Sequence, residues 1–318
     1  MLKIILVIFI LLVLFVLYFL SLKIFFKKKR LNFIDYWDDD WKNKSDKKYF
    51  KKLSKNPALK NYDSINIYSV FGNSHVSTEK GTYNIQFSGE SIFRNPDLFH
   101  LNLIPEKHDF IEKKNIIDCP PFMHLFLNSI FKNNNYSFIR SISEADVLKK
   151  NFCLFSVSNG EAKQRIDFFK ELSKIKKIDS CGKIENNKSD CPGRDEYNSN
   201  ENCTFISGYK FMICFENCSM YNYCTEKILN AYMCGTIPIY WGCPNISDFI
   251  NMDSIFHLPA EYTMEEEKAL IHQIIECDSN IESYIKKYNQ PLFKNNKIPE
   301  KLKFGQIFKN TLFKHQKN

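Results

Sequence analysis

Glycine is scarce in this chain, with 10 residues among 318. No glycine-rich phosphate loop occurs, so nucleotide sites of the P-loop or dinucleotide-binding type are poorly supported. The eleven cysteines are odd in number, which leaves at least one thiol free. Cys214, Cys218 and Cys224 lack the CxxC spacing of a zinc site, so we expect them to pack rather than to bind metal.

Clustered basic residues interleaved with aromatic ones are also lacking, although the formal net charge is +8. The lysines are scattered and no nucleic-acid-binding motif is present, so we expect no nucleic acid partner. The positive charge instead favours anionic ligands or membrane surfaces. With 44% hydrophobic and 25% charged residues, the composition is typical of an α/β protein. The length allows roughly two domains of ~150 residues each.

A continuous apolar run covers residues 4–22, apart from Tyr18 and Ser21. As a helix rising ~1.5 Å per residue it would reach about 28 Å, close to the ~30 Å hydrocarbon core of a bilayer. A basic cluster at 27–30 follows, with no small-residue cleavage site. The sequence therefore predicts a single membrane-anchoring helix, with residues 1–30 as the anchor and its basic flank.

The stretch 209–249 reads YKFMICFENCSMYNYCTEKILNAYMCGTIPIYWGCPNISDF. Its first seven residues have the composition of a buried strand. Thr225 occupies an N-cap position before a helical run, and Gly235 can end that helix in a left-handed conformation. A second apolar run, 236–241, follows. This pattern predicts a strand–loop–helix–strand unit, and ligands of open α/β sheets bind at the carboxyl ends of such strands.

The loop and helix start of this unit carry an unusual concentration of polar side chains. They are Glu216, Asn217, Tyr221, Tyr223, Glu226 and Lys227. A helix N-terminus offers free N–H groups and a partial positive charge, to which Lys227 adds a full charge. This arrangement suits a diphosphate, while the carboxylates and Asn217 suit sugar or ribose hydroxyls.

The segments FEN, CSMYNYC, TEK and AYxxGTIPIYWG together resemble the donor-site signature of the α1,3-fucosyltransferases of glycosyltransferase family 10. Weaker similarity runs from about Leu31 to the region of Phe293. The resemblance implies a GT-B fold, in which two Rossmann-like domains face a cleft, and GDP-fucose as the donor. We expect an acceptor-side domain at 31–150, a GDP-fucose-binding domain at 151–293 and a basic tail at 294–318.

In the first domain we expect a short strand that starts the stretch 31–41 and runs into an acidic loop, and further strands at 65–71 and 83–87. Strands that alternate with polar or helical connectors favour a parallel sheet. In the second domain we expect a strand at 151–158, a helix from about 162 to 173, a strand near 178–182 and helices at 264–277 and 281–288. The polar composition of residues 183–202 indicates an insertion after the strand near 178–182. A further amphipathic helix is expected at 122–131.

Glu90 directly follows a predicted strand end, where a carboxylate can project into a cleft. By position alone, a capping or solvent-facing role is the better interpretation. However, FSGES followed by NPDLF resembles the family segment that carries the catalytic base, although the residues directly after Glu90 depart from the family pattern. Partial burial would raise the pKa of this carboxyl above its usual ~4.3 and improve it as a base.

Arg165 lies six residues after Asn159, and this spacing matches the family arginine that contacts the donor pyrophosphate. An arginine on a helix is more often a surface residue, but a guanidinium suits two phosphate oxygens. The implied donor site uses Arg165 and Lys227 for the diphosphate, Asn217 and Glu226 for hydroxyls, and Tyr223 for the nucleotide-sugar. We expect no required cofactor and a divalent cation that is at most stimulatory. The acidic run 38–40 is expected to be a solvated loop.

The resemblance implies an inverting transferase that moves L-fucose from GDP-fucose to an acceptor glycan, in α1,3 linkage to GlcNAc or Glc of an N-acetyllactosamine-type glycan. Two alternatives stay open. One is an enzyme of the same fold that uses another nucleotide sugar, and the other is an inactive, membrane-anchored carbohydrate-binding homologue.

The family resemblance also implies a Golgi-type membrane with the enzyme in the lumen. The positive-inside rule predicts the opposite orientation, because five basic residues follow the apolar run and only Lys3 precedes it. The side of the membrane therefore stays open.

Overall fold

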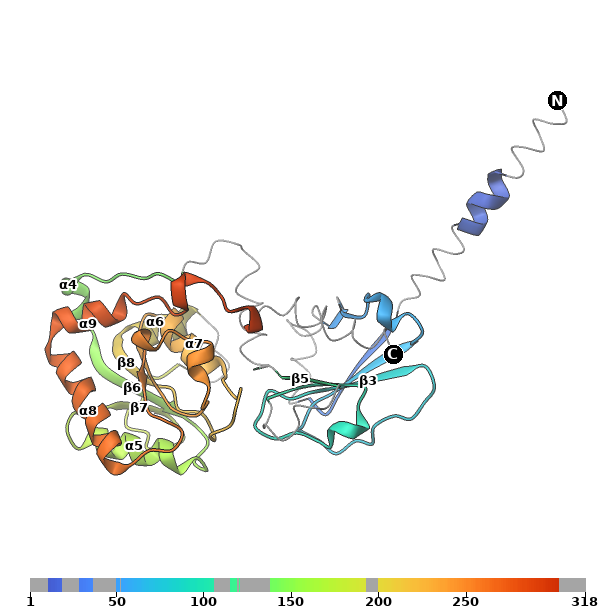
Figure 1. Cartoon of the computed structure of the whole chain (residues 1–318). Helices are drawn as coiled ribbons and strands as arrows, with labels where there is room; N and C mark the ends of the chain where they lie inside the picture. The colour runs from blue at the N-terminus through green and yellow to red at the C-terminus, as the bar shows by residue number, and fades with distance from the viewer. Residues whose placement is uncertain are drawn as a thin grey trace. The chain divides into compact units, whose positions relative to one another are not determined.

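The computed structural model describes residues 11–18, 29–36, 50–51, 53–105, 115–118, 120, 138–192 and 200–302. They fall into two compact units, drawn in Figure 1. They contain two five-stranded β-sheets. The loop Ser88–Phe93 belongs with the second unit, although it follows a strand of the first sheet. The predicted α/β fold with parallel strands is confirmed, whereas the predicted cleft between two domains stays a prediction.

The first sheet has the strand order β1-β2-β3-β4-β5. Its strands are β1 (Arg30–Ile34), β2 (Ser64–Tyr68), β3 (Thr82–Phe87), β4 (Leu101–Ile104) and β5 (Ile116–Asp118), with short 3-10 helices η2 (Pro57–Leu59) and η3 (Pro96–Leu98) in the connections. β1, β2 and β3 pair in parallel. Asn32, Asn66 and Asn84 are in register across these strands and their amides hydrogen-bond, over 2.8 Å and 3.4 Å, so polar groups inside this sheet are satisfied by one another.

The second sheet has the order β10-β9-β8-β6-β7, and its pairs are parallel. Its strands are β6 (Asn151–Val157), β7 (Asp179–Gly182), β8 (Tyr209–Ile213), β9 (Ile237–Tyr240) and β10 (Phe256–His257). The chain runs from β6 outward to β7, returns to the other side of β6 as β8, and then continues outward to β10. The order therefore reverses between β6 and β8, and such a switch point is where open α/β sheets bind ligands.

Helices cover both faces of the second sheet. They are α4 (Glu144–Val147), α5 (Lys163–Ser173), α6 (Asn200–Ser207), α7 (Glu226–Met233), α8 (Met264–Ser279) and α9 (Ile281–Tyr288), with the 3-10 helices η6 (Ile246–Asp248), η7 (Met252–Ser254), η8 (Lys294–Asn296) and η9 (Glu300–Leu302). Alternate residues of β8 face opposite sides: Phe211 and Ile213 pack with α5, α8 and α9, whereas Met212 packs with α6 and α7. Figure 1 shows these helices around the sheet.

The predicted anchor is described only at residues 11–18, which are helical and exposed. Within the described ranges, no helix combines the length and apolarity that crossing a bilayer requires. The rest of the run 4–22 lies outside the described residues, as does the expected helix at 122–131.

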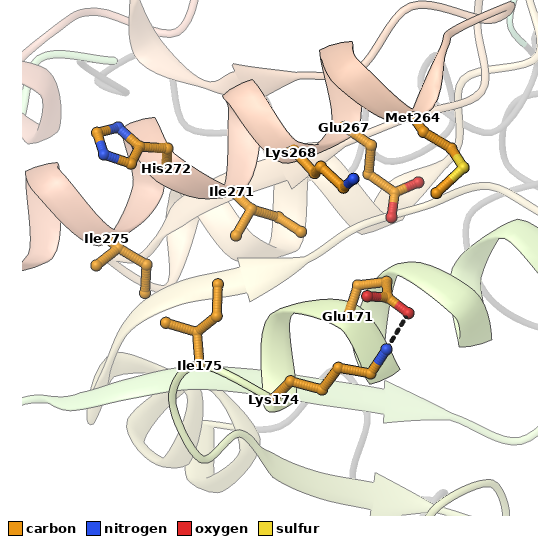
Figure 2. Close-up of a pocket in the computed structure, with 9 residues that line it drawn as sticks. All are labelled: Glu171, Lys174, Ile175, Met264, Glu267, Lys268, Ile271, His272 and Ile275. Atoms are coloured by element: carbon orange, nitrogen blue, oxygen red, sulfur yellow. Dashed lines mark hydrogen bonds and ion pairs between the residues drawn. The ribbon is translucent and has the colours of Figure 1, made fainter.

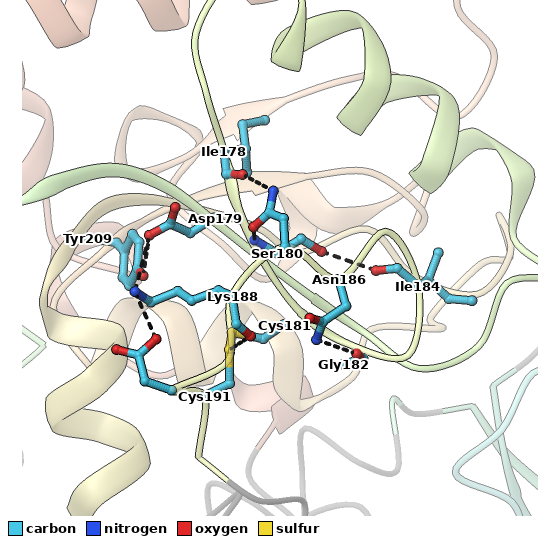
Figure 3. Close-up of a disulfide and its surroundings, with 12 residues drawn as sticks. Ile178, Asp179, Ser180, Cys181, Gly182, Ile184, Asn186, Lys188, Cys191 and Tyr209 are labelled. Atoms are coloured by element: carbon cyan, nitrogen blue, oxygen red, sulfur yellow. Dashed lines mark hydrogen bonds and ion pairs between the residues drawn. A yellow bond between two sulfur atoms is a disulfide. The ribbon is translucent and has the colours of Figure 1, made fainter.

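The polar insertion expected at 183–202 contains more structure than the sequence predicted. A disulfide between Cys181 and Cys191 closes the loop after β7, and Figure 3 shows Lys188 beside it, reaching Asp179. Lys188 also forms an ion pair with Asp190. Helix α6 begins at Asn200, inside the predicted insertion. Neither feature has a sequence signal in the periodicity of apolar residues, because the loop is polar and α6 buries only Ile206 fully.

Candidate functional site

The switch point of the second sheet brings together two of the predicted site residues. Arg165 lies on α5, which follows β6, and Asn217 lies in the loop that follows β8. An Nη2 hydrogen of Arg165 is donated to Oδ1 of Asn217 over 2.6 Å. The two residues are far apart in sequence, but the loops after neighbouring parallel strands emerge at the same edge of the sheet.

Arg165 is buried, with 3% of its surface exposed, so the surface interpretation of this arginine is wrong. Its Nε has no hydrogen-bond partner, and no carboxylate of the described residues forms an ion pair with it. Burial lowers the pKa of the guanidinium, whereas the negative charge of Glu216 raises it. A buried cation without a direct ion-pair partner is costly, and an anionic ligand in contact with it would reduce that cost.

Glu216 is the central residue of the site, although the sequence placed it only among the crowded polar residues. It is fully buried and lies in the loop that follows β8. Its Oε1 accepts the backbone N–H of Thr225 over 2.8 Å, and its Oε2 accepts the Thr225 hydroxyl over 2.8 Å. Tyr240 donates its hydroxyl to Oε1 over 3.4 Å. Thr225 is the N-cap of α7 as predicted, but its own side chain makes no capping bond, and the Glu216 carboxylate binds this residue instead.

Gly242 explains why Glu216 fits at this place. It adopts φ +140°, and a Cβ added to it would lie 2.6 Å from Cβ of Glu216. The missing side chain therefore makes room for the carboxylate. A glutamate directly after the apolar run 209–215, with a glycine directly after the apolar run 236–241, is the sequence signal that could have identified this pair.

Lys227 lies in the first turn of α7, where the sequence predicted it. Its Nζ donates to Oε2 of Glu216 over 3.0 Å and lies 3.0 Å from Oγ1 of Thr225. Partial burial lowers the pKa of the ammonium group, but the carboxylates of Glu216 and Glu226 outweigh burial and raise it above its usual value. Lys227 is therefore a fixed positive charge. Glu226 is the first residue of α7 and is half-buried.

Glu90 lies against the same set of residues. The hydroxyl of Tyr223, which is 2% exposed, donates to Oε2 of Glu90 over 3.3 Å. Burial raises the pKa of Glu90, against the opposing effects of the Lys227 charge and the Tyr223 hydrogen bond. The direction agrees with the expectation for a base. Tyr223, predicted to bind the nucleotide-sugar, contacts the carboxylate of Glu90 in this structure.

The loop that carries Glu90 is held by Ser88. Its Oγ lies 3.0 Å from the carbonyl oxygen of Glu90 and 2.6 Å from that of Ile92, and it accepts the N–H of Glu90 over 3.2 Å. Ser88 is fully buried. A single buried hydroxyl thus fixes the backbone on both sides of the Glu90 side chain.

Within the part of the chain that the structure describes, no three His, Cys, Asp or Glu side chains converge as metal ligands do. The expectation that no metal is required stays a prediction, and the acidic run 38–40 lies outside the described residues. A separate pocket of about 360 Å³ lies between α5 and α8, and Figure 2 shows Ile175 facing Ile271 and Ile275 across it. None of the predicted site residues lines this pocket.

Residues 147–296 match the family model described as "Glycosyltransferase family 10 (fucosyltransferase) C-term". An alpha-(1,3)-fucosyltransferase of Helicobacter pylori is 40% identical over 115 residues, which cover 36% of this chain and 23% of that protein. A putative fucosyltransferase of Acanthamoeba polyphaga mimivirus is 30% identical over 183 residues, 53% of this chain and 30% of that protein. The alignments therefore span less than a third of these curated relatives.

Among solved structures, an alpha1,3-fucosyltransferase crystallised with GDP-fucose superimposes with a TM-score of 0.63. The alignment covers 89% of this chain and 90% of that chain at 20% sequence identity. At 20% identity, this structural similarity shows the fold. The superimposed part of the chain extends beyond the segment that the family model matches.

Proposed function

We propose that the chain transfers L-fucose from GDP-fucose to a hydroxyl group of an acceptor glycan, because residues 147–296 match the model of the glycosyltransferase family 10 (fucosyltransferase) domain. The observation that carries the proposal is the buried Arg165, which forms no direct ion pair among the described residues and lies at the switch point of the second sheet. A donor diphosphate is an anion of the right kind for this position.

The proposed reaction is a direct displacement at the anomeric carbon, which inverts its configuration. Glu90 takes the proton of the acceptor hydroxyl, and its raised pKa makes it a stronger base than an exposed carboxylate. The bond between the anomeric carbon and the diphosphate oxygen breaks as the new glycosidic bond forms. Arg165, Lys227 and the N-terminus of α7 stabilise the charge that develops on the leaving diphosphate.

The remaining residues bind the donor around these groups. Asn217 orients Arg165 through its 2.6 Å hydrogen bond and offers its amide to a hydroxyl. Glu226, half-buried at the start of α7, accepts hydrogen bonds from ribose or fucose hydroxyls. Tyr223 holds the base and packs on the nucleotide-sugar.

For the acceptor we propose GlcNAc or Glc of an N-acetyllactosamine-type glycan, fucosylated in α1,3 linkage. The resemblance of the donor block to that of the α1,3-fucosyltransferases supports this acceptor, and the similarity to the alpha-(1,3)-fucosyltransferase of Helicobacter pylori supports the linkage. The competing proposals are another nucleotide sugar and an inactive carbohydrate-binding protein.

Calorimetric titration with GDP and UDP tests the donor. We expect GDP to bind more tightly than UDP, and Arg165→Ala to weaken GDP binding by tenfold or more, about 1.4 kcal/mol. Lys163→Ala is the matched control, because Lys163 lies on the same helix with 83% of its side chain exposed and should leave the affinity unchanged. Preference for UDP would favour the other nucleotide sugar, and no nucleotide binding at all would refute the proposal.

Turnover separates an enzyme from an inactive homologue. The measurement is acceptor-dependent release of GDP from GDP-fucose, with N-acetyllactosamine-type acceptors. Glu90→Gln should abolish release and leave GDP-fucose binding nearly intact. Equal loss of binding would contradict the assignment of Glu90 as the base.

Attachment to a membrane through residues 4–22 is part of the proposal, supported by the length and apolarity of that run. Resistance of the full chain to alkaline extraction from membranes tests it. Protease protection in sealed vesicles then distinguishes a Golgi-type lumenal orientation from the cytoplasmic one that the basic flank favours.

A further inference from the structure

One loop of the second unit contains an exposed asparagine with a glycine directly after it. Asn159 and Gly160 lie between β6 and α5, and the pair Asn-Gly occurs nowhere else among the 318 residues. Both residues are exposed, as is Glu161. Glycine has no side chain to shield its own backbone nitrogen, so this nitrogen can approach the side-chain amide of the residue before it.

The side chain of Asn159 is folded back over the peptide bond that follows it. Its Oδ1 accepts the backbone N–H of Glu161 over 2.8 Å, which is an Asx turn. To reach an N–H two residues further along the chain, the side-chain carbonyl has to pass beside the nitrogen of Gly160. The turn therefore holds Cγ of Asn159 near the backbone nitrogen that is the nucleophile in asparagine cyclisation.

The same hydrogen bond suits the charge that develops when this nitrogen attacks. Negative charge then builds up on Oδ1 of Asn159, and an N–H donor at 2.8 Å lies at the distance that stabilises an oxyanion. Neither Nδ2 of Asn159 nor the N–H of Gly160 makes a hydrogen bond to any residue that the structure describes. Because both residues are exposed, water can take up and supply the protons of the reaction.

The asparagines in the loop after β7 are held differently. The side-chain amide of Asn187 is tied at both ends: Oδ1 accepts the N–H of Ser180 over 2.8 Å, and Nδ2 donates to the carbonyl oxygen of Ile178 over 2.9 Å. Asn186 is exposed, but the next residue is another asparagine. Sequence and contacts therefore both distinguish Asn159.

We propose that Asn159 deamidates spontaneously in the folded protein. The deprotonated backbone nitrogen of Gly160 attacks Cγ of Asn159, a carbon–nitrogen bond forms, and the bond between Cγ and Nδ2 breaks with release of ammonia. Water then opens the cyclic imide at either of its carbonyl groups. The products are aspartate and isoaspartate, and the net reaction consumes water and releases ammonia without any oxidation or reduction.

The modification changes the loop that leads into α5, whose third residue is the buried Arg165. Both products add a negative charge, and isoaspartate also lengthens the backbone by a methylene carbon. The added charge repels a diphosphate near Arg165, and the longer backbone alters the entry to the helix. This consequence rests on the proposed GDP-fucose site, whereas the deamidation itself does not.

Peptide mapping of the full chain tests the reaction. The protein is incubated at mildly alkaline pH, folded in one sample and unfolded in guanidinium in the other, and both are digested in acid. We expect the peptide containing Asn159 to gain the mass difference between a hydroxyl and an amino group, at a rate in the folded protein at least equal to that in the unfolded chain. A lower rate in the folded protein would show that the turn protects the amide, and would refute the proposal.

Gly160→Ala is the matched control variant. A methyl group at this position hinders the attack, and it requires only a small shift of Ile184, whose Cδ1 lies 3.1 Å from the added Cβ. Conversion of Asn159 should fall several-fold in the variant, and isoaspartate should form in the wild type, because direct hydrolysis of the amide gives aspartate alone. Asn186 should stay unmodified in both digests. Equal conversion in the two proteins, without isoaspartate, would contradict the attack by Gly160.

GDP binding measures the consequence for the candidate site. The deamidated protein separates from the unmodified protein by ion exchange, because it carries an additional negative charge. Calorimetric titration should show a GDP affinity lower by about threefold or more in the deamidated form. Equal affinities would overturn the consequence for the donor site, whereas absence of GDP binding in both forms would refute the proposed function rather than the deamidation.

Discussion

The carboxylate of Glu216 lies 3.0 Å from the ammonium nitrogen of Lys227, and the same fully buried carboxylate accepts the backbone N–H of Thr225. One acidic side chain thus pairs with the lysine and fixes the start of α7. Because the pair is fixed before any ligand binds, Lys227 needs little reorganisation to meet a developing negative charge.

We expect strong coupling between Glu216 and Lys227 in a double-mutant cycle. Glu216→Gln leaves a largely buried ammonium group without its counter-ion, and Lys227→Met leaves a fully buried carboxylate without its cation. Each should lower the free energy of unfolding by roughly 2–4 kcal/mol, whereas the double variant should lose less than the sum, with a coupling of about 1–3 kcal/mol. Urea denaturation at neutral pH measures these values.

The exposed pair Lys174–Glu171 serves as the control for this cycle. Its atoms are 2.6 Å apart, but the side chains are 67% and 47% exposed, so solvent screens the charges. Its coupling should stay below about 0.5 kcal/mol. Additive losses at Glu216 and Lys227 would mean that the buried pair does not stabilise the site.

Gly242 should tolerate substitution less well than Gly235. Both have positive φ, and Gly235→Ala should cost about 1 kcal/mol for that reason alone, since only the hydroxyl of Tyr288 lies near its Cβ position, at 3.1 Å. Gly242→Ala adds a clash with Cβ of Glu216 and should cost roughly 2–4 kcal/mol. Urea denaturation of the two variants gives the comparison, and equal losses would show that Glu216 can move aside.

Local patterns predicted much of the second unit. Features that are set by residues close together in sequence were predicted, and the structure confirms them. They are the strands β8 and β9, the N-cap position of Thr225 and the left-handed conformation of Gly235. Thr236 donates to the carbonyl oxygen of Ala231 and Gly235 to that of Tyr232, which is the helix ending expected at a C′ glycine.

Contacts between distant segments could not be predicted in this way. Tyr223 meets Glu90 across 133 positions of sequence, and Arg165 meets Asn217 across 52. The resemblance to the α1,3-fucosyltransferases indicated which residues belong to the site. It did not indicate that Tyr223 binds the carboxylate of Glu90 or that Glu216 pairs with Lys227. Helix α6 was missed because its single fully buried residue leaves no helical period of apolar residues.

The raised pKa of Glu90 makes this residue a local source of instability at neutral pH. Folding disfavours the charged form of an acid whose pKa is higher in the folded than in the unfolded state. The free energy of unfolding therefore falls as the pH rises through the folded pKa, and it is regained as the pH falls. Glu90→Gln should therefore increase the free energy of unfolding at pH 7–8. The gain should disappear below about pH 4, where the unfolded carboxyl is also protonated.

Urea denaturation of both proteins across this pH range measures the effect without any substrate. Glu144→Gln is the control, because Glu144 is exposed and its substitution should change stability little at any pH. A loss of stability in Glu90→Gln at neutral pH would mean that its ionised form is favoured by the fold, and the assignment of Glu90 as an activated base would lose its physical basis.

Replacing Asn217 by aspartate should affect stability and donor binding in opposite directions. The new carboxylate would lie at the position of the amide, 2.6 Å from Nη2 of Arg165, and give the buried guanidinium the counter-ion it lacks among the described residues. The free energy of unfolding should rise by about 1 kcal/mol near neutral pH. Since the partner lowers the folded pKa of such a carboxyl, the gain should be lost as the pH falls through that pKa, below the unfolded value of ~3.9.

GDP affinity should fall by tenfold or more in Asn217→Asp, because the charge of Arg165 is then already neutralised and the new carboxylate repels the diphosphate. Asn217→Ala is the matched variant: it removes the same hydrogen bond and should lower stability by about 1 kcal/mol, but it leaves the charge of Arg165 free and should weaken GDP binding far less. Calorimetric titration of both variants distinguishes charge from positioning. Equal losses of affinity would mean that Asn217 matters for its own contact with the ligand, and that the unpaired charge of Arg165 is not what attracts the donor.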